Sequence, residues 1–240
     1  MNAKKWHVCV LVPAKNEEEL LPRCLKSILL ACRQVQPYST TDIVLCVDSS
    51  TDKTYTIGTQ LLKNNGCVIE IAKECVGSAR KQAALIALQR YKGPLQSCWL
   101  SNTDADCEVP LNWLSNQLAW ASKGVHGVSG TVRVDNYDEH EAGVAEIFLN
   151  NYTINPDGTH PHIHGANLGI RADVYQKIGG WFELETAEDH DLWNRLSLLN
   201  FKKISDANLY VCTSGRKIGR APHGFANYLA TCKEINNKKI

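Results

Sequence analysis

Short apolar runs alternate with amphipathic stretches along the first half of the chain. Four runs have the length and composition of buried strands: residues 7–12, 43–47, 67–72 and 99–102. Helical patterns follow the runs and begin after residues 17–19, near Asp52, at Gly77 or Ser78, and at Pro110. Ser50 and Thr51 are candidate caps for the second helix. Strands separated in this way by helices predict an α/β fold with a mostly parallel sheet that helices cover on both faces.

The second half of the chain has shorter and less regular patterns. We expect strands at residues 128–134, 167–170 and 208–212. We expect helices at residues 139–150, from Ala172, and at residues 188–199. A loop rich in His, Pro, Asn and Gly occupies residues 151–165. Because no internal repeat and no linker-like segment interrupts the chain, residues 1–240 are predicted to form a single domain with two subregions.

Composition narrows the class of protein. The chain has 240 residues, of which 44% are hydrophobic and 21% charged, close to the average for globular domains. A formal net charge of +1 provides no basic field that would favour nucleic acid as a partner. Residues 1–5 do not resemble a signal peptide, and no apolar run approaches membrane-spanning length. We therefore expect a cytoplasmic protein without a transmembrane segment.

The ten cysteines leave two interpretations, a disulfide framework or reduced thiols. Several of them lie within predicted strands or helices, and no C-x-x-C motif occurs. Free cysteine packs as a small hydrophobic residue. Reduced, buried thiols in a cytosolic protein are therefore the better interpretation.

Polar side chains follow each of the four strands predicted in the first half, at residues 13–16, 48–50, 73–75 and 104–106. Because ligands of parallel sheets bind beyond the carboxyl ends of the strands, these segments are expected to meet. Asp104 and Asp106 suit a hard divalent cation whose remaining positions are filled by phosphate oxygens. Such a cation would neutralise charge on a departing diphosphate. The alternative is an Asp-rich turn that caps the helix at Pro110.

Five segments of the chain match motifs of one known family, and they occur along the chain in the same order as in that family. They are VLVPAKNE at 10–17, VDSSTDKT at 47–54, DAD at 104–106, HGANLGI at 164–170, and GGWF at 179–182 followed by EDHDL at 188–192. Through them the chain resembles family 2 glycosyltransferases with the GT-A fold, over nearly its whole length. The resemblance implies a Rossmann-like sheet, a nucleotide-sugar-binding half at about residues 1–125, and an acceptor-binding and catalytic half at about residues 126–240.

For the first half, the resemblance implies metal and nucleotide contacts. Asp104 and Asp106, with Ala105 between them, would hold Mn²⁺ or Mg²⁺ against the diphosphate of a nucleotide-sugar. Asp48 would accept a hydrogen bond from the nucleobase, uracil or guanine, with a helix cap as the alternative. Further nucleotide contacts are expected from Pro13, Ala14 and Glu17 in the base and ribose pocket, and from Gly77 and Arg80 at a helix start near the phosphates. A solvated basic helix face is the alternative for Arg80.

For the second half, the resemblance implies a catalytic base and a closing loop. Asp189 would take the proton of the acceptor hydroxyl, with an ordinary acidic helix start as the alternative. The basic, glycine-rich residues 213–225 would fold over the diphosphate, with a mobile loop as the alternative. In that segment His223 is a candidate third metal ligand, and Arg216 or Arg220 would pair with phosphate oxygens.

Three histidines, His160, His162 and His164, alternate in the loop of the second half. An extended chain would place all three side chains on one side. Their spacing is not a standard one for zinc, so solvated or hydrogen-bonded histidines are favoured over a metal cluster.

We therefore expect a metal-dependent glycosyltransferase that moves a sugar from a UDP- or GDP-sugar to a hydroxyl acceptor, with inversion through an Asp general base. The acceptor is a saccharide, a small molecule, or a lipid-linked compound reached at the inner membrane face. One alternative is a nucleotidyltransferase that acts on a sugar phosphate. Such an enzyme normally has a glycine-rich, basic loop directly after the first strand, and residues 13–17 fit that pattern poorly. The other is an inactive nucleotide-binding module of the same fold. The sequence leaves the donor sugar, the acceptor and the oligomeric state open.

Overall fold

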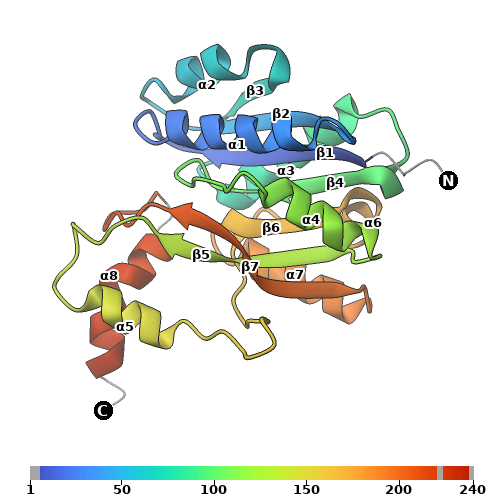
Figure 1. Ribbon diagram of the computed structural model, residues 1–240. Helices are drawn as coiled ribbons and strands as arrows, with labels where there is room; N and C mark the ends of the chain where they lie inside the picture. The colour runs from blue at the N-terminus through green and yellow to red at the C-terminus, as the bar shows by residue number, and fades with distance from the viewer. Residues whose placement is uncertain (1–5, 221–223, 238–240) are drawn as a thin grey trace.

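A seven-stranded sheet forms the centre of the computed structural model, which describes residues 6–220 and 224–237 (Figure 1). The strands are β1 (Trp6–Ala14), β2 (Ser39–Asp48), β3 (Gly66–Ile71), β4 (Cys98–Asn102), β5 (Gly127–Val134), β6 (Leu168–Arg171) and β7 (Lys203–Thr213). Their order across the sheet is β3-β2-β1-β4-β6-β5-β7. β6 runs antiparallel to both of its neighbours, and the other paired strands are parallel. The prediction of an α/β fold with a mostly parallel sheet is therefore confirmed.

Helices cover both faces of the sheet (Figure 1). They are α1 (Leu21–Val35), α2 (Thr54–Leu62), α3 (Val76–Arg90), α4 (Trp113–Ser122), α5 (Val144–Asn151), α6 (Ala172–Lys177), α7 (Glu188–Leu198) and α8 (Phe225–Asn237). One buried cluster packs α1 and α4 against the sheet, and a second packs α3, α6 and α7 against the opposite face. α5 and α8 pack on each other beyond the ends of β5 and β7 (Figure 1).

The alternation of side chains along β1 explains why both faces are apolar. Val8, Val10 and Val12 belong to the cluster under α1, whereas Cys9 and Leu11 belong to the cluster under α3. All five side chains are fully buried. Burial of a valine or leucine side chain contributes about 1.5–3 kcal/mol, so a central strand requires apolar residues at consecutive positions.

The strand order places an opening beside the carboxyl end of β1. β1 pairs with β2 on one side and with β4 on the other, and the chain reaches these two neighbours in opposite directions across the sheet. At such a switch point the loops that follow the strands separate and leave a crevice in which ligands bind. The polar segments after β1, β2, β3 and β4 therefore surround one opening.

The predicted starts of α4, α5 and β7 are wrong, for local reasons. α4 begins at Trp113 and not at Pro110, because residues 110–112 form a turn closed by the bond from Trp113 N–H to Pro110 O. α5 begins at Val144 and not at residue 139, because Gly143 precedes it with a left-handed φ of 90°. β7 begins five residues earlier than predicted, because an irregularity at Gly130 divides its pairing with β5 into two parts.

All ten cysteines are described by the structure, and all are free thiols. Cys67, Cys75 and Cys212 are partly exposed and the other seven are buried. Burial raises the pKa of Cys32 and of Cys46 to about 12, which keeps these thiols neutral. Within the described ranges, none of the helices has the length and apolar character needed to cross a bilayer.

Candidate active site

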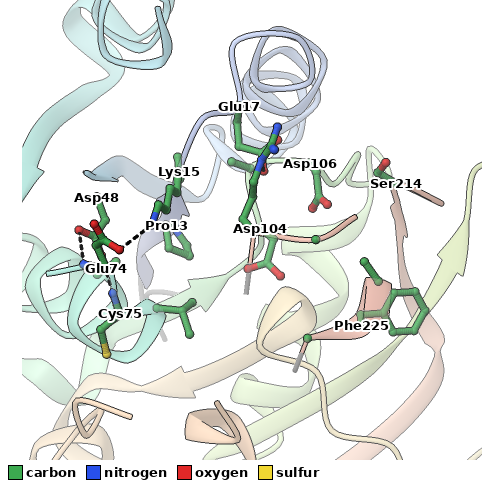
Figure 2. Close-up of a pocket in the computed structure, with 18 of the residues that line it drawn as sticks. Pro13, Lys15, Glu17, Asp48, Glu74, Cys75, Asp104, Asp106, Ser214 and Phe225 are labelled. Atoms are coloured by element: carbon green, nitrogen blue, oxygen red, sulfur yellow. Dashed lines mark hydrogen bonds and ion pairs between the residues drawn. The ribbon is translucent and has the colours of Figure 1, made fainter. Parts of the chain in front are cut away.

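A cavity of about 470 Å³ opens at the carboxyl ends of β1, β2 and β4. Its volume lies in the range of small-molecule and cofactor sites. Figure 2 shows Asp48, Lys15 and Glu74 at one end, Asp106, Ser214 and Phe225 at the other, and Asp104 between them. Of the residues expected to contact metal or nucleotide, these line the cavity: Pro13, Ala14, Glu17, Asp48, Asp104, Ala105, Asp106, Arg216 and Arg220.

Hydrogen bonds from the segment after β2 hold the turn after β1. The N–H of Asn16 donates to Oγ of Ser50 (2.9 Å), and the N–H of Thr51 donates to Oδ1 of Asn16 (2.7 Å). The N–H of Glu17 donates to Oγ1 of Thr54 (2.8 Å). Ser50 and Thr51 therefore do not cap α2 as predicted; they connect the turn after β1 with the segment after β2. The side chain that bonds the first turn of α2 is Asp52, whose Oδ1 accepts the N–H of Thr54 at 2.9 Å.

Asp48 ends β2 and holds the segment that follows β3. Its carboxylate accepts the backbone N–H groups of Lys73, Glu74 and Cys75 at 2.8–2.9 Å, and Oγ of Ser49 at 2.9 Å. Burial raises the pKa of Asp48, but the three backbone bonds and the Ser49 hydroxyl outweigh burial, and the net shift is downward. Asp48 is therefore ionised at neutral pH and does not cap α2. A contact between Asp48 and a nucleobase stays a prediction.

Asp104 and Asp106 follow β4 and face two arginines. Nη2 of Arg80 lies 2.6 Å from Oδ1 of Asp104, and Nη2 of Arg216 lies 2.6 Å from Oδ2 of Asp106. Burial raises the pKa of Asp106, and Arg216 opposes that shift without cancelling it. Neither aspartate bonds the first turn of α4, so the Asp-rich capping turn is not what the structure shows.

The donor set fits a hard divalent cation. Asp104 and Asp106 offer only oxygen ligands on the cavity wall. Across residues 6–220 and 224–237, no three His, Cys, Asp or Glu side chains form a group that would hold a metal ion without help. A cation here would therefore take its other ligands from water or a diphosphate, as Mg²⁺ sites commonly do.

Arg80 is buried behind the cavity and not on a solvated helix face. Its side chain is 2% exposed and joins two carboxylates, because Nε lies 3.0 Å from Oε1 of Glu188 while Nη2 binds Asp104. A Cβ on Gly165 would lie 2.5 Å from Nη2 of Arg80, so the glycine leaves the space that the guanidinium fills. Arg80 connects the aspartates after β4 with the first residue of α7, and it is not among the residues that line the cavity.

Gly77 does not present its N–H to the cavity. That N–H donates to the carbonyl oxygen of Leu184 at 3.2 Å, and a Cβ at Gly77 would lie 2.3 Å from the oxygen of Phe182. The glycine therefore allows the segment before α7 to pack on the start of α3. The predicted use of the Gly77 N–H for phosphate disagrees with this geometry.

Asp189 lies in the first turn of α7. Its Oδ2 accepts the N–H of Gly165 at 2.7 Å. Asp189 does not line the cavity, but its neighbour Glu188 is joined through Arg80 to Asp104. The start of α7 is thus fixed relative to the aspartates after β4, and the role of Asp189 as a base stays a prediction.

The segment after β7 covers one side of the cavity. Arg216 binds Glu17 with both terminal nitrogens, at 2.6 and 3.1 Å, in addition to Asp106. Nε of Arg220 lies 3.8 Å from Oε1 of Glu17. Burial raises the pKa of Glu17 even though Arg216 opposes the shift. His223, the predicted third metal ligand, lies outside the described residues.

Comparison with known sequences identifies the family. The sequence profile described as Glycosyl transferase family 2 matches residues 9–179. The chain belongs to glycosyl transferase family 2. This family 2 chain is 30% identical over 133 residues to the undecaprenyl-phosphate 4-deoxy-4-formamido-L-arabinose transferase of Serratia proteamaculans, and 28% identical to that of Pectobacterium carotovorum. Both alignments cover 55% of this chain but only 38% of the relative, so the chain spans less than half the length of these relatives.

Solved structures show that the fold is GT-A. The mannosyltransferase PcManGT from Pyrobaculum calidifontis, in complex with GDP-Man and Mn²⁺, superposes with a TM-score of 0.67 at 20% identity, over 90% of this chain and 59% of that one. S. aureus TarS 1-349, in complex with UDP-GlcNAc, superposes with a TM-score of 0.65 at 15% identity, over 91% and 61%. The predicted fold and family are therefore confirmed for this family 2 chain.

The alternating histidines of this family 2 chain stack in a row. Ring centroids of His160 and His162 lie 5.8 Å apart, and those of His162 and His164 lie 6.0 Å apart. Tyr152 stacks on His162 at 3.9 Å, and its hydroxyl bonds Nε2 of His164 at 2.9 Å. The expected placement on one side is confirmed, and the three rings are not part of any group, among the described side chains, that would hold a metal.

Some cavity residues were not predicted as site residues. Lys15, Lys73, Glu74 and Cys75 line the cavity beside Asp48. Their position after predicted strands was the available signal. Glu185 also lines it, from the segment that packs on α3, and no local pattern marks this residue.

Proposed function

We propose that this chain transfers a sugar from a UDP- or GDP-sugar to a hydroxyl acceptor, with Mn²⁺ or Mg²⁺ and with inversion at the anomeric carbon. One observation supports this most strongly. A single cavity has the carboxylate of Asp48 at one end and those of Asp104 and Asp106 toward the other, at the switch point of a GT-A sheet (Figure 2). That spacing of groups suits a nucleoside at the first end and a diphosphate at the second.

The residues that would hold the donor follow from this placement. Pro13, Ala14 and Asp48 would contact the base and ribose. Asp104 and Asp106 would hold the divalent cation, which when bound neutralises charge on the leaving diphosphate. Arg216 and Arg220 would pair with phosphate oxygens, because a guanidinium binds phosphate in a bidentate way. Donor binding then requires Arg216 to exchange Asp106 for phosphate.

Asp189 would act as the general base. Its carboxylate takes the proton of the acceptor hydroxyl while the hydroxyl oxygen bonds to the anomeric carbon. The bond from that carbon to the diphosphate oxygen breaks, and the nucleoside diphosphate leaves with the bonding electrons. The bond from the Gly165 N–H to Oδ2 of Asp189 orients the carboxylate for this step. Closure of the segment after β7 would exclude water and limit hydrolysis of the donor.

The acceptor is proposed as a class only. The relatives named above carry undecaprenyl-phosphate, a lipid phosphate, in their names, which supports an acceptor at a membrane surface. The proposed hydroxyl acceptors also include a saccharide and a small molecule.

Metal-dependent nucleotide binding tests the proposal. Isothermal titration of UDP and of GDP, each with and without Mn²⁺, should show binding of a nucleotide only with the metal. Asp104→Asn should abolish the metal dependence, whereas Asp157→Asn, at an exposed position away from the cavity, should leave it unchanged. Absence of binding by any nucleoside diphosphate to folded protein with Mn²⁺ would contradict the proposed function.

A further inference from the structure

One carboxylate on the cavity wall has no partner among the described residues. The acidic side chains that line the cavity are Glu17, Asp48, Glu74, Asp104, Asp106 and Glu185. The first five of these bond to arginine, to lysine or to backbone N–H groups. Across residues 6–220 and 224–237, no hydrogen bond or ion pair involves the side chain of Glu185. Its acceptor positions are therefore available to a ligand in the cavity.

The segment that carries this carboxylate, residues 182–187, lies on the start of α3, and we call it the strap. The carbonyl oxygen of Leu184 accepts the N–H of Gly77 at 3.2 Å. Nζ of Lys81, in the second turn of α3, lies 2.6 Å from Oε1 of Glu183. These bonds fix the two residues that precede the unpaired glutamate, so the strap presents its carboxylate from a defined position.

At its other end the strap leads directly into α7, which carries the proposed base. Ala187 has a φ of 60°, which is uncommon for a residue with a Cβ and turns the chain into the helix. The next residue, Glu188, pairs with Nε of Arg80 at 3.0 Å, and Arg80 also binds Asp104. The unpaired carboxylate is thus held between the start of α3 and the start of α7.

The proposed reaction requires the transferred sugar to lie beside the strap. The anomeric carbon is bonded to the diphosphate at Asp104, and it must face Asp189 in the first turn of α7. The strap borders this space, because it lines the cavity through Glu185 and continues into α7. From α3, Val76 and Ala79 add apolar lining on which the C–H groups of a sugar ring would pack.

We propose that Glu185 binds hydroxyl groups of the transferred sugar, so that the site selects a donor with a neutral sugar over a donor with a uronate. This inference rests on the proposed function. An ionised carboxylate offers about four acceptor positions and no donor, which hydroxyl groups of a neutral sugar satisfy. Hydrogen bonds to a charged acceptor are stronger than neutral ones. The carboxylate of a uronate has no hydrogen to donate, and its charge repels that of Glu185.

Two series of donors, measured by isothermal titration with Mn²⁺, test the inference on the unaltered chain. UDP, UDP-glucose and UDP-glucuronate share one nucleotide, and GDP, GDP-mannose and GDP-mannuronate share the other. In the series whose nucleotide binds, the uronate form should bind at least about tenfold more weakly than the neutral form. Equal or tighter binding of the uronate form overturns the inference. If neither UDP nor GDP binds to the folded protein, the proposed function fails instead.

A variant tests whether this glutamate causes the preference. Glu185→Gln keeps the size of the side chain and removes its charge. The ratio of the two dissociation constants, uronate over neutral, should fall about fivefold or more, while the affinity for the nucleoside diphosphate alone stays within about twofold. An unchanged ratio would show that another group sets the preference.

Glu183→Gln is the matched control. It makes the same change two positions earlier in the strap, at a residue that does not line the cavity. Its amide oxygen still accepts a hydrogen bond from Lys81, which Glu183 contacts at 2.6 Å, so the strap keeps its attachment to α3. The ratio should stay as in the unaltered chain. An equal fall in both variants would assign the effect to the strap as a whole and refute a direct contact between Glu185 and the sugar.

Discussion

Arg216 binds Asp106 across the cavity: its Nη2 lies 2.6 Å from Oδ2 of Asp106, and the same guanidinium holds both oxygens of Glu17. In sequence, Arg216 is 110 residues from Asp106 and 199 from Glu17. A positive charge therefore stands beside the carboxylates proposed for the metal. It pairs with two carboxylates whose pKa values burial raises.

Removal of the Arg216 guanidinium should increase the affinity of the protein for a metal ion in the absence of nucleotide. In the unaltered chain, Asp106 must give up its charge-assisted hydrogen bond to Arg216, which contributes about 1.5–3 kcal/mol, before it can bind the metal. In Arg216→Ala this cost is absent. We expect affinity for Mn²⁺, without nucleotide, to rise about tenfold or more, measured by electron paramagnetic resonance of free Mn²⁺. Arg220→Ala is the control, because Arg220 is half exposed and lies 3.8 Å from Glu17. Equal or weaker Mn²⁺ binding by folded Arg216→Ala would refute competition between the guanidinium and the metal.

Loss of the proposed base should affect chemistry and not donor binding. Asp189→Asn is expected to lower kcat by about 10²–10⁴-fold, the usual contribution of general base catalysis. Nucleotide affinity should be unchanged, because Asp189 does not line the cavity. Asp191→Asn, in the same turn but paired with Arg195 at 2.6 Å, should keep most of the rate. A near-normal rate in Asp189→Asn would remove this residue as the base and make a retaining mechanism worth testing.

Two adjacent basic residues of α3 should differ strongly in their effect on folding. Arg80→Met leaves Asp104 and Glu188 without their buried partner, and loss of one member of a buried ion pair costs about 3–5 kcal/mol. Lys81→Met removes an exposed pair with Glu183 and should leave the free energy of unfolding unchanged within error. Urea denaturation measures both. Similar unfolding midpoints for the two variants would show that the Arg80 network does not stabilise the fold.

Stability should fall in mild acid because of His164. Burial, with the neighbouring His162 and His160, lowers the pKa of His164 from 6.5 to about 3. The unfolded chain therefore binds a proton below pH 6.5 that the folded chain does not bind until about pH 3, so stability is lost as pH falls through this window. Between pH 7 and pH 5 this one group accounts for about 2 kcal/mol.

His164→Gln is the matched variant for this pH effect. Glutamine does not titrate, and its amide can still bond the hydroxyl of Tyr152, which His164 bonds at 2.9 Å. Urea denaturation at pH 7 and pH 5 should show a smaller loss of stability for the variant than for the unaltered chain. Equal losses would show that His164 does not titrate between the folded and unfolded states in this window.

Much of the nucleotide-facing half could be predicted from local patterns. Strand β1 and the turn at residues 13–17 follow from a consecutive apolar run and the proline that ends it. The carboxylates of Asp48, Asp104 and Asp106 could be placed together because parallel strands end at one edge of the sheet. The lengths of α5 and β7 could not be predicted, because a left-handed glycine and an irregular strand pairing set them.

The sequence by itself determined which apolar runs would form the strands, where their polar ends lie, and to which family the motifs belong, because these depend on neighbours within a few positions. The tertiary structure alone decided which charges pair. Arg80 is buried between Asp104, 24 residues away, and Glu188, 108 residues away. The N–H of Gly77 donates to Leu184 because the segment before α7 packs on the start of α3. Buried charges need partners, and the fold determines which partners are within reach.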